Sequence, residues 1–151
     1  MTVDANMAIW NELVLFTQIW NDGVMARILM AEDDSSMRDF LAAALRRAGH
    51  EVEACEDGLA ALERLKHPDP AGNDEQKYNL LLADIVMPGM DGVELAQRAM
   101  SLNPGLKVMF ITGFAAVAMG QRNAMPEAPR ILSKPFHLKD LVDQVESLLA
   151  A

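Results

Sequence analysis

Cysteine is nearly absent from this sequence, since Cys55 is the only one among 151 residues. A single thiol cannot form a disulfide within the chain, and no group of cysteines and histidines has the spacing of a zinc site. This pattern is typical of a reducing compartment, so we predict a cytoplasmic protein. Cys55 itself is expected to be a small apolar residue at the end of a strand.

Basic residues are also scarce. The chain has 13 Lys and Arg against 22 Asp and Glu, which gives a net charge of -9 and a pI near 4.7. A chain with this balance is repelled by a phosphate backbone and lacks the usual electrostatic contribution to nucleic-acid binding. We therefore expect no nucleic-acid partner.

Long apolar runs are missing from the N-terminal region. Between residues 7 and 20 the longest run has four residues, and no Lys or Arg precedes Arg27. These features argue against a signal peptide or a membrane span, so no membrane partner is expected. Residues 1–24 form an extension with two open interpretations. It is an amphipathic helix that docks on the domain or on a partner, or it precedes a true translation start at Met25. The helical interpretation rests on the spacing of Ile9, Leu13, Phe16 and Trp20.

The remaining residues, 25–151, are the right size for one domain with a full core. Within them, five short apolar runs alternate with helical patterns, which predicts a doubly wound parallel sheet of the α/β class. The run at 79–83 is apolar throughout, as expected for a central strand covered on both faces. The other predicted strands are 27–31, 51–55, 107–111 and 130–133.

Each predicted helix has an apolar face. Ser35 or Ser36 can cap the first helix, and Asp57 begins the second. The inward residues of the first helix are Met37, Phe40, Leu41, Ala44, Leu45 and Ala48; those of the second are Leu59, Leu62 and Leu65; those of the third are Leu95, Ala96, Ala99 and Met100; those of the last are Leu138, Leu141, Val142, Val145, Leu148 and Leu149.

Two stretches are poor in regular structure. Residues 67–76 contain two prolines and a glycine and are predicted to form a surface loop. Residues 113–129 are interrupted by Gly120, Pro126 and Pro129, so a fourth helix there should be short or mobile.

Polar residues follow four of the five predicted strands at their carboxyl ends, where the strands of an open parallel sheet present their ligand sites. The set is Glu32, Asp33, Asp84, Thr112 and Lys134. Clustered carboxylates repel one another unless a cation joins them, and an oxygen-only donor set suits Mg²⁺. A carboxylate between such a cation and a lysine is well placed to accept a phosphoryl group, which would make Asp84 an acyl phosphate.

Neighbouring polar residues have simpler interpretations. Asp34 is predicted to cap the first helix rather than to join the acidic cluster. We assign no chemistry to the three histidines: His137 precedes the last helix as an exposed residue, and His50 and His67 are expected at the surface.

Four segments resemble the receiver domain of two-component response regulators, in order and over residues 26–149. They are EDDSSMR (32–38), DIVMPGMDG (84–92), FITG (110–113) and SKPF (133–136). The resemblance implies a flavodoxin-like receiver fold with strand order 2-1-3-4-5 and a cis bond between Lys134 and Pro135. It also implies a histidine kinase or histidine phosphotransferase as the phosphodonor.

The resemblance further implies a role for each residue of the cluster. Asp84 is the phosphorylated residue, and Glu32 and Asp33 form an acidic pocket. The expected Mg²⁺ ligands are Asp33, Asp84 and the main-chain carbonyl of Val86. Thr112 and Lys134 bind the phosphoryl group.

FITGFAAVA (110–118) and LSKPFHLKDLV (132–142) are more narrowly similar to CpdR-type stand-alone regulators of alphaproteobacteria. That similarity implies an adaptor for the ClpXP protease, binding ClpX, that acts when it is unphosphorylated. One departure falls at the switch position three residues before Lys134. Receivers often have an aromatic there that couples to Thr112, and this chain has Ile131.

Alternative functions are a phosphate sink for a histidine kinase and, less favoured, a phosphatase with an aspartate nucleophile. Phosphatases of the haloacid dehalogenase class place an acid two residues after the nucleophile, where this chain has Val86. A flavodoxin-like flavin carrier should have a hydroxyl- and glycine-rich loop after the first strand, where this chain has acids.

Overall fold

The computed structural model describes residues 25–67, 77–113 and 129–150. In these ranges the chain forms one sheet of five parallel strands in the order β2-β1-β3-β4-β5. The strands are β1 (Arg27–Ala31), β2 (Glu51–Cys55), β3 (Leu80–Asp84), β4 (Lys107–Thr112) and β5 (Arg130–Ser133). The predicted fold class, strand order and strand positions are confirmed, to within one residue at the ends of β3 and β4.

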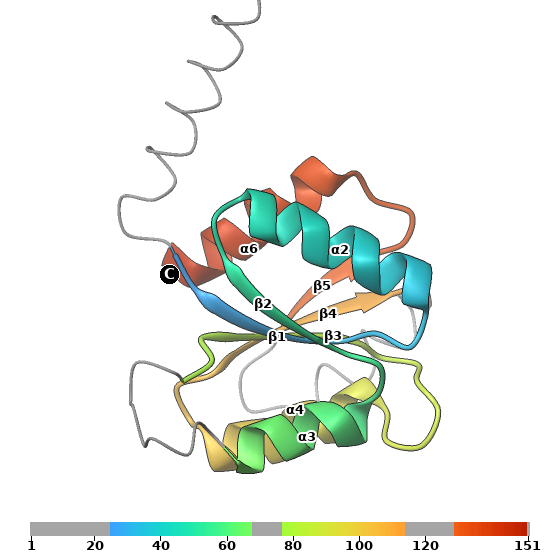
Figure 1. Ribbon diagram of the computed structural model, residues 1–151, viewed down its shortest axis with the longest axis vertical. Helices are drawn as coiled ribbons and strands as arrows, with labels where there is room; N and C mark the ends of the chain where they lie inside the picture. Colours follow the sequence, from blue (N-terminus) through green and yellow to red (C-terminus); the bar gives the residue numbers. More distant parts are fainter. Residues whose placement is uncertain (1–24, 68–76, 114–128, 151) are drawn as a thin grey trace, which may run out of the picture.

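Four helices in the described ranges cover the two faces of the sheet (Figure 1). α2 (Ser35–Arg47) and α6 (Leu138–Ala150) lie on one face, and α3 (Gly58–Lys66) and α4 (Gly92–Leu102) lie on the other. The segments 1–24, 68–76 and 114–128 lie outside the described residues. The predictions about the N-terminal extension, the loop and the fourth helix therefore stay predictions. Among the described helices, none has the length and apolar character needed to cross a membrane.

The core has two parts because each strand of a parallel sheet sends alternate side chains to opposite faces. Leu29, Leu81 and Phe110 pack with α3 and α4, whereas Ile28, Leu82 and Met109 pack with α2 and α6. All five residues of β3 are buried, which confirms that it is a central strand. Cys55 is buried at the end of β2, as predicted, and burial raises the pKa of its thiol to about 11.

Aspartates cap α2, α3 and α4, three of the helices that start at the carboxyl edge of the sheet. Asp34 accepts a hydrogen bond from Met37 N–H at 2.9 Å, Asp57 from Ala60 N–H at 2.8 Å, and Asp91 from Glu94 N–H at 2.8 Å. Each cap pairs with a main-chain donor that the helix cannot satisfy by itself. Asp34 therefore has the predicted capping role, and the alternative cap at Ser35 or Ser36 is wrong.

Two inward positions and one surface position were also predicted wrongly. Phe40 and Leu59 are 55% and 59% exposed, so they lie outside the buried stripes of α2 and α3. The inward face of α3 is instead formed by Ala61, Leu62 and Leu65. His50 is 5% exposed rather than at the surface, because it precedes β2 beneath α6 and finds a partner there.

We predict that Leu62→Ala lowers the free energy of unfolding by about 2–5 kcal/mol, because it opens a cavity between α3 and the sheet. The matched substitution Leu59→Ala, three residues earlier in the same helix, should change it by less than about 0.5 kcal/mol. Urea unfolding of both variants measures the difference. Equal losses would contradict the placement of the two leucines.

Candidate functional site

The predicted acidic residues meet at the carboxyl edge of the sheet. Glu32 and Asp33 follow the end of β1, and Asp84 is the last residue of β3. β1 and β3 are neighbours, with Ala31 paired to Ala83, so the strand order itself brings the three acids together. Asp33 and Asp84, which are 51 positions apart in the chain, thus become neighbours.

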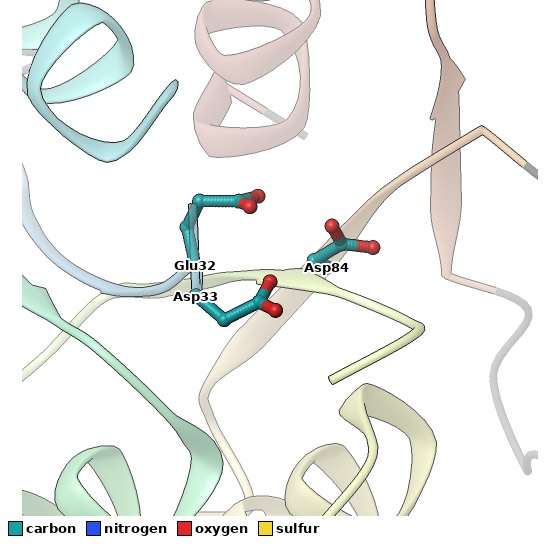
Figure 2. Close-up of side chains that lie close together, drawn as sticks. All are labelled: Glu32, Asp33 and Asp84. Carbon is teal, nitrogen blue, oxygen red and sulfur yellow. The ribbon is translucent and has the colours of Figure 1, made fainter. Parts of the chain in front are cut away.

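The three side chains lie close together, and those of Glu32 and Asp33 extend toward Asp84 (Figure 2). One oxygen from each of Glu32, Asp33 and Asp84 lies within 4.8 Å of the others. Glu32 and Asp84 are buried, at 1% and 8% exposure, whereas Asp33 is exposed. The cluster therefore has a closed inner side and an open outer side through which a ligand can enter.

Lys134 provides the positive charge beside these acids. Its Nζ lies 3.1 Å from Asp84 Oδ2 and 3.8 Å from Glu32 Oε2. Its main-chain N–H donates to the Thr112 carbonyl at 2.8 Å, which fixes the end of β5 to the end of β4. The bond between Lys134 and Pro135 is cis, as predicted. Partial burial lowers the pKa of the Lys134 ammonium, but the hydrogen bond and charge of Asp84 outweigh this and the net pKa is raised.

Thr112 and Ile131 lie on the strands next to this centre. Thr112 is the fully buried last residue of β4, and Asp84 on β3 pairs in register with the residue before it, Ile111. Ile131 is partly buried on β5, where it pairs in register with Phe110 and packs against the core beneath α3 and α4. The roles assigned to both residues stay predictions.

The turn after Asp84 folds back closely on the strand end. Val86 N–H donates to Asp84 Oδ1 at 3.2 Å, and the Val86 side chain is 52% exposed. Gly92 N–H donates to the Ile85 carbonyl at 2.9 Å. A Cβ added at Gly92 would lie 2.2 Å from the main-chain oxygen of Asp84, so only glycine allows α4 to begin this close to the strand. Val86 is therefore held beside Asp84, and the role of its carbonyl stays a prediction.

Glu32 is the acid of the site whose pKa is shifted most clearly. Burial, followed by repulsion from the Asp84 charge, raises the pKa of Glu32 to about 7. Its Oε1 accepts from Asp34 N–H at 3.2 Å, whereas its buried Oε2 has no hydrogen-bond partner within the described part of the chain. Lys134 Nζ lies 3.8 Å from this oxygen, too far for a hydrogen bond. A buried carboxylate oxygen that accepts no hydrogen bond is costly, and a cation bound beside it would reduce that cost.

The residues fit a divalent cation of the magnesium type. The donor set contains only oxygen atoms, three carboxylates lie within reach of one point, and Glu32 Oε2 accepts no hydrogen bond from the described residues. Mg²⁺ binds through a few carboxylates and keeps several waters, which suits a cluster that is open on the Asp33 side. Such an acidic triad is typical of the receiver magnesium site.

Sequence reasoning missed two residues that shape this site. Arg38 NH1 donates to the main-chain carbonyl of Glu32 at 2.9 Å and so fixes the acidic turn from α2. Gly92 was given no role beyond its place in the segment 84–92, although its close approach to Asp84 is what requires a glycine. The spacing of Arg38 after the acids was a usable signal, but the approach of Gly92 depends on tertiary packing.

Comparison with known proteins agrees with the geometry. Residues 28–146 match the response regulator receiver domain family. The response regulator receiver protein CpdR of Brucella abortus (strain 2308) is 52% identical over 127 residues, which cover 84% of this chain and 99% of that protein. The match thus extends over almost the whole length of the relative.

Two solved structures have the same architecture. The receiver domain of the hybrid histidine kinase CckA aligns with a TM-score of 0.65 at 31% identity, covering 82% of this chain and 98% of that one. The response regulator TrrA of Thermotoga maritima, solved in complex with Mg²⁺ and BeF, aligns with a TM-score of 0.67 at 28% identity, covering 82% and 99%.

The raised pKa of Glu32 predicts a pH dependence of stability in metal-free solution. An acid with a higher pKa in the folded state stabilises the fold below its unfolded pKa, near 4.5, and this contribution is lost as the pH rises through about 7. Glu32→Gln removes the ionisation and keeps an oxygen for Asp34 N–H. We compare the free energy of unfolding of Glu32→Gln with that of wild type at each pH. The difference in favour of the variant should be on the order of 2–3 kcal/mol larger at pH 8 than at pH 5.

Urea unfolding in EDTA at both pH values measures this difference. Added Mg²⁺ should stabilise wild type at pH 8 more than Glu32→Gln, because the cation compensates the carboxylate. A gain for Glu32→Gln that is the same at both pH values would show that Glu32 does not titrate as described.

Proposed function

We propose that this chain, which belongs to the response regulator receiver domain family, is switched by phosphorylation of Asp84. The proposal is carried by one observation: the buried Asp84 carboxylate lies 3.1 Å from Lys134 Nζ and within reach of two further carboxylates. The chain is a receiver-domain regulator rather than an enzyme that turns over a substrate. Its family implies a kinase or phosphotransfer protein as a partner.

In the proposed reaction, a carboxylate oxygen of Asp84 attacks the phosphorus of a phosphohistidine on the donor. The new O–P bond forms as the P–N bond breaks, and the electron pair of that bond stays on the donor imidazole, which then takes a proton from solvent. Asp84 has no proton to lose because it reacts as a carboxylate. The product is an acyl phosphate on Asp84 and an unmodified histidine on the donor.

Residues around Asp84 would stabilise the transferred group. Lys134 already contacts Asp84 and can follow the new negative charge onto a phosphoryl oxygen, while the Thr112 hydroxyl would donate to another. Asp33, Asp84 and the Val86 carbonyl would hold Mg²⁺, with Glu32 completing the acidic pocket. The cation supplies neutralisation of charge on the phosphoryl oxygens.

The proposed output is a change in protein binding. When Lys134 and Thr112 turn to the phosphoryl group, the ends of β4 and β5 shift with them, because Lys134 N–H is bonded to the Thr112 carbonyl. Ile131 precedes Lys134 on β5 and occupies the switch position. An aliphatic side chain cannot make the hydroxyl or ring contacts of an aromatic one, so the switch here would act through packing with Phe110.

A CpdR-type role would give this chain a specific output partner. The identity of 52% with CpdR over 99% of that protein supports the proposal that this chain is an adaptor for ClpXP and binds ClpX in its unphosphorylated state. The alternative within the family is a phosphate sink that drains a histidine kinase and has no output partner. The phosphatase alternative is disfavoured because Val86 offers no acid or base two residues after Asp84.

Phosphorylation at Asp84 predicts that Asp84→Asn abolishes Mg²⁺-dependent transfer from a radiolabelled phosphohistidine donor, because an amide is not a nucleophile at neutral pH. The matched control is Asp57→Asn, an acid at the same sheet edge that caps α3 and that an amide can replace. It should accept label as wild type does. Labelling that survives Asp84→Asn would overturn the proposed acceptor.

The adaptor role predicts state-dependent binding of purified ClpX. Unphosphorylated wild type and Asp84→Asn should both bind, and beryllofluoride with Mg²⁺, a phosphoryl mimic, should weaken the wild-type interaction by about tenfold or more while leaving Asp84→Asn unchanged. Surface plasmon resonance with immobilised ClpX measures these affinities. No binding in either state would contradict the adaptor and favour the phosphate sink.

A further inference from the structure

A buried polar contact joins α6 to the amino edge of the sheet, the edge opposite to Asp84. His50 Nε2 lies 2.7 Å from Glu146 Oε1, and the two side chains are only 1% and 8% exposed. His50 precedes β2 and Glu146 lies on α6, 96 positions later. We call this pair the α6 latch. The proposed function makes no use of it.

The hydrogen bonds of His50 determine which ring nitrogen donates and which accepts. Its Nδ1 accepts from Ala26 N–H at 3.1 Å, so this nitrogen carries no proton. A neutral ring then has its proton on Nε2, which donates to Glu146. A second proton on Nδ1 would face the Ala26 N–H and break that bond. The ring therefore joins Ala26, just before β1, to α6 through one defined tautomer.

The latch is a costly way to attach a helix. Glu146 Oε2 is buried without a hydrogen-bond partner within the described ranges, and apolar residues of similar volume often stabilise such a site as well or better. The neighbouring attachment of α6 is already apolar, through Leu141 and Val145. The hydrophobic effect is non-directional, whereas the buried hydrogen bond between His50 and Glu146 adds a directional constraint on the position of α6.

The two ends of α6 lie near different parts of the sheet. Leu138 begins α6 four residues after Lys134, which contacts Asp84. Glu146 lies eight residues further on, about 12 Å along the helix axis. α6 crosses the sheet beside α2 and ends near the start of β1 (Figure 1). The helix is thus connected to the phosphorylation site at its start and to the amino edge of the sheet near its end.

We propose that the α6 latch holds the C-terminal half of α6 in place while the end near Lys134 responds to phosphorylation of Asp84. The latch then confines the response to the first two turns of α6. It makes His50 and Glu146 positioning residues for the output surface. The second part of this proposal, the confinement of a response, rests on the proposed function, whereas the holding of α6 does not.

Glu146→Leu and Glu146→Gln separate the latch from simple packing. Leucine has a similar volume and cannot accept a hydrogen bond, whereas glutamine keeps an oxygen for His50 Nε2–H. Amide hydrogen exchange of the full chain without any phosphoryl mimic should be roughly two- to tenfold faster at residues 145–150 in Glu146→Leu than in wild type. Glu146→Gln should restore slow exchange.

Gln144→Leu is the matched control. Gln144 Oε1 accepts from Arg130 NH1 at 3.1 Å on the exposed side of the same helix, so its loss should leave exchange at 145–150 unchanged. Lys107 Nζ also donates to the Leu148 carbonyl at 2.8 Å. If that bond alone held the helix end, Glu146→Leu would exchange as wild type does, and this result would overturn the latch.

Addition of Mg²⁺ and beryllofluoride tests the confinement. In wild type the change in exchange should stop before residue 145, and in Glu146→Leu it should extend to residue 150. A change that reaches residue 150 in wild type would overturn the confinement. If beryllofluoride changes the amide exchange of no residue of α6 in wild type, the proposed output is contradicted instead. The measurements without beryllofluoride then still decide whether the latch holds the helix.

Discussion

Mutual repulsion among three carboxylates is the constraint around which this site is built. Glu32, Asp33 and Asp84 converge within 4.8 Å because strand order makes β1 and β3 neighbours. Two of the three acids are buried, so water cannot screen them well. Lys134 compensates part of this charge, with its Nζ 3.1 Å from Asp84 Oδ2 and 3.8 Å from Glu32 Oε2. Glu32 Oε2 has no hydrogen-bond partner among the described residues. A centre that is short of positive charge is well prepared for a divalent cation.

Several other features of the fold position the elements around the three acids. The caps at Asp34, Asp57 and Asp91 start three helices at the same edge, and Gly92 lets α4 approach the main chain of Asp84. Lys134 links the acidic centre to the start of α6, and the His50–Glu146 pair holds the far end of that helix. A change of charge on Asp84 can therefore be transmitted to one surface helix, because that helix has one responsive end and one fixed end.

Much of this was readable from the sequence for physical reasons. Apolar runs predict the strands of a doubly covered sheet, and the strand ends predict that Asp84, Thr112 and Lys134 lie at one edge of it. Helical spacing located the buried stripes but not their edges, so Phe40 and Leu59 were predicted to be buried although both are exposed. His50 was predicted at the surface because its partner, Glu146, is 96 positions away and no local pattern connects them. Residues 114–128 lie outside the described ranges, so the predicted fourth helix stays open.

The central claim is that Asp84, and no other acid of the cluster, carries the phosphoryl group. The most direct measurement is to phosphorylate wild type with a small-molecule phosphodonor and Mg²⁺, reduce the acyl phosphate with borohydride, and map the modified residue by peptide mass spectrometry. Reduction converts a phosphorylated aspartate to homoserine, and we predict this change at Asp84 alone. Homoserine at Asp33 or Asp34, with Asp84 unmodified, would contradict the account.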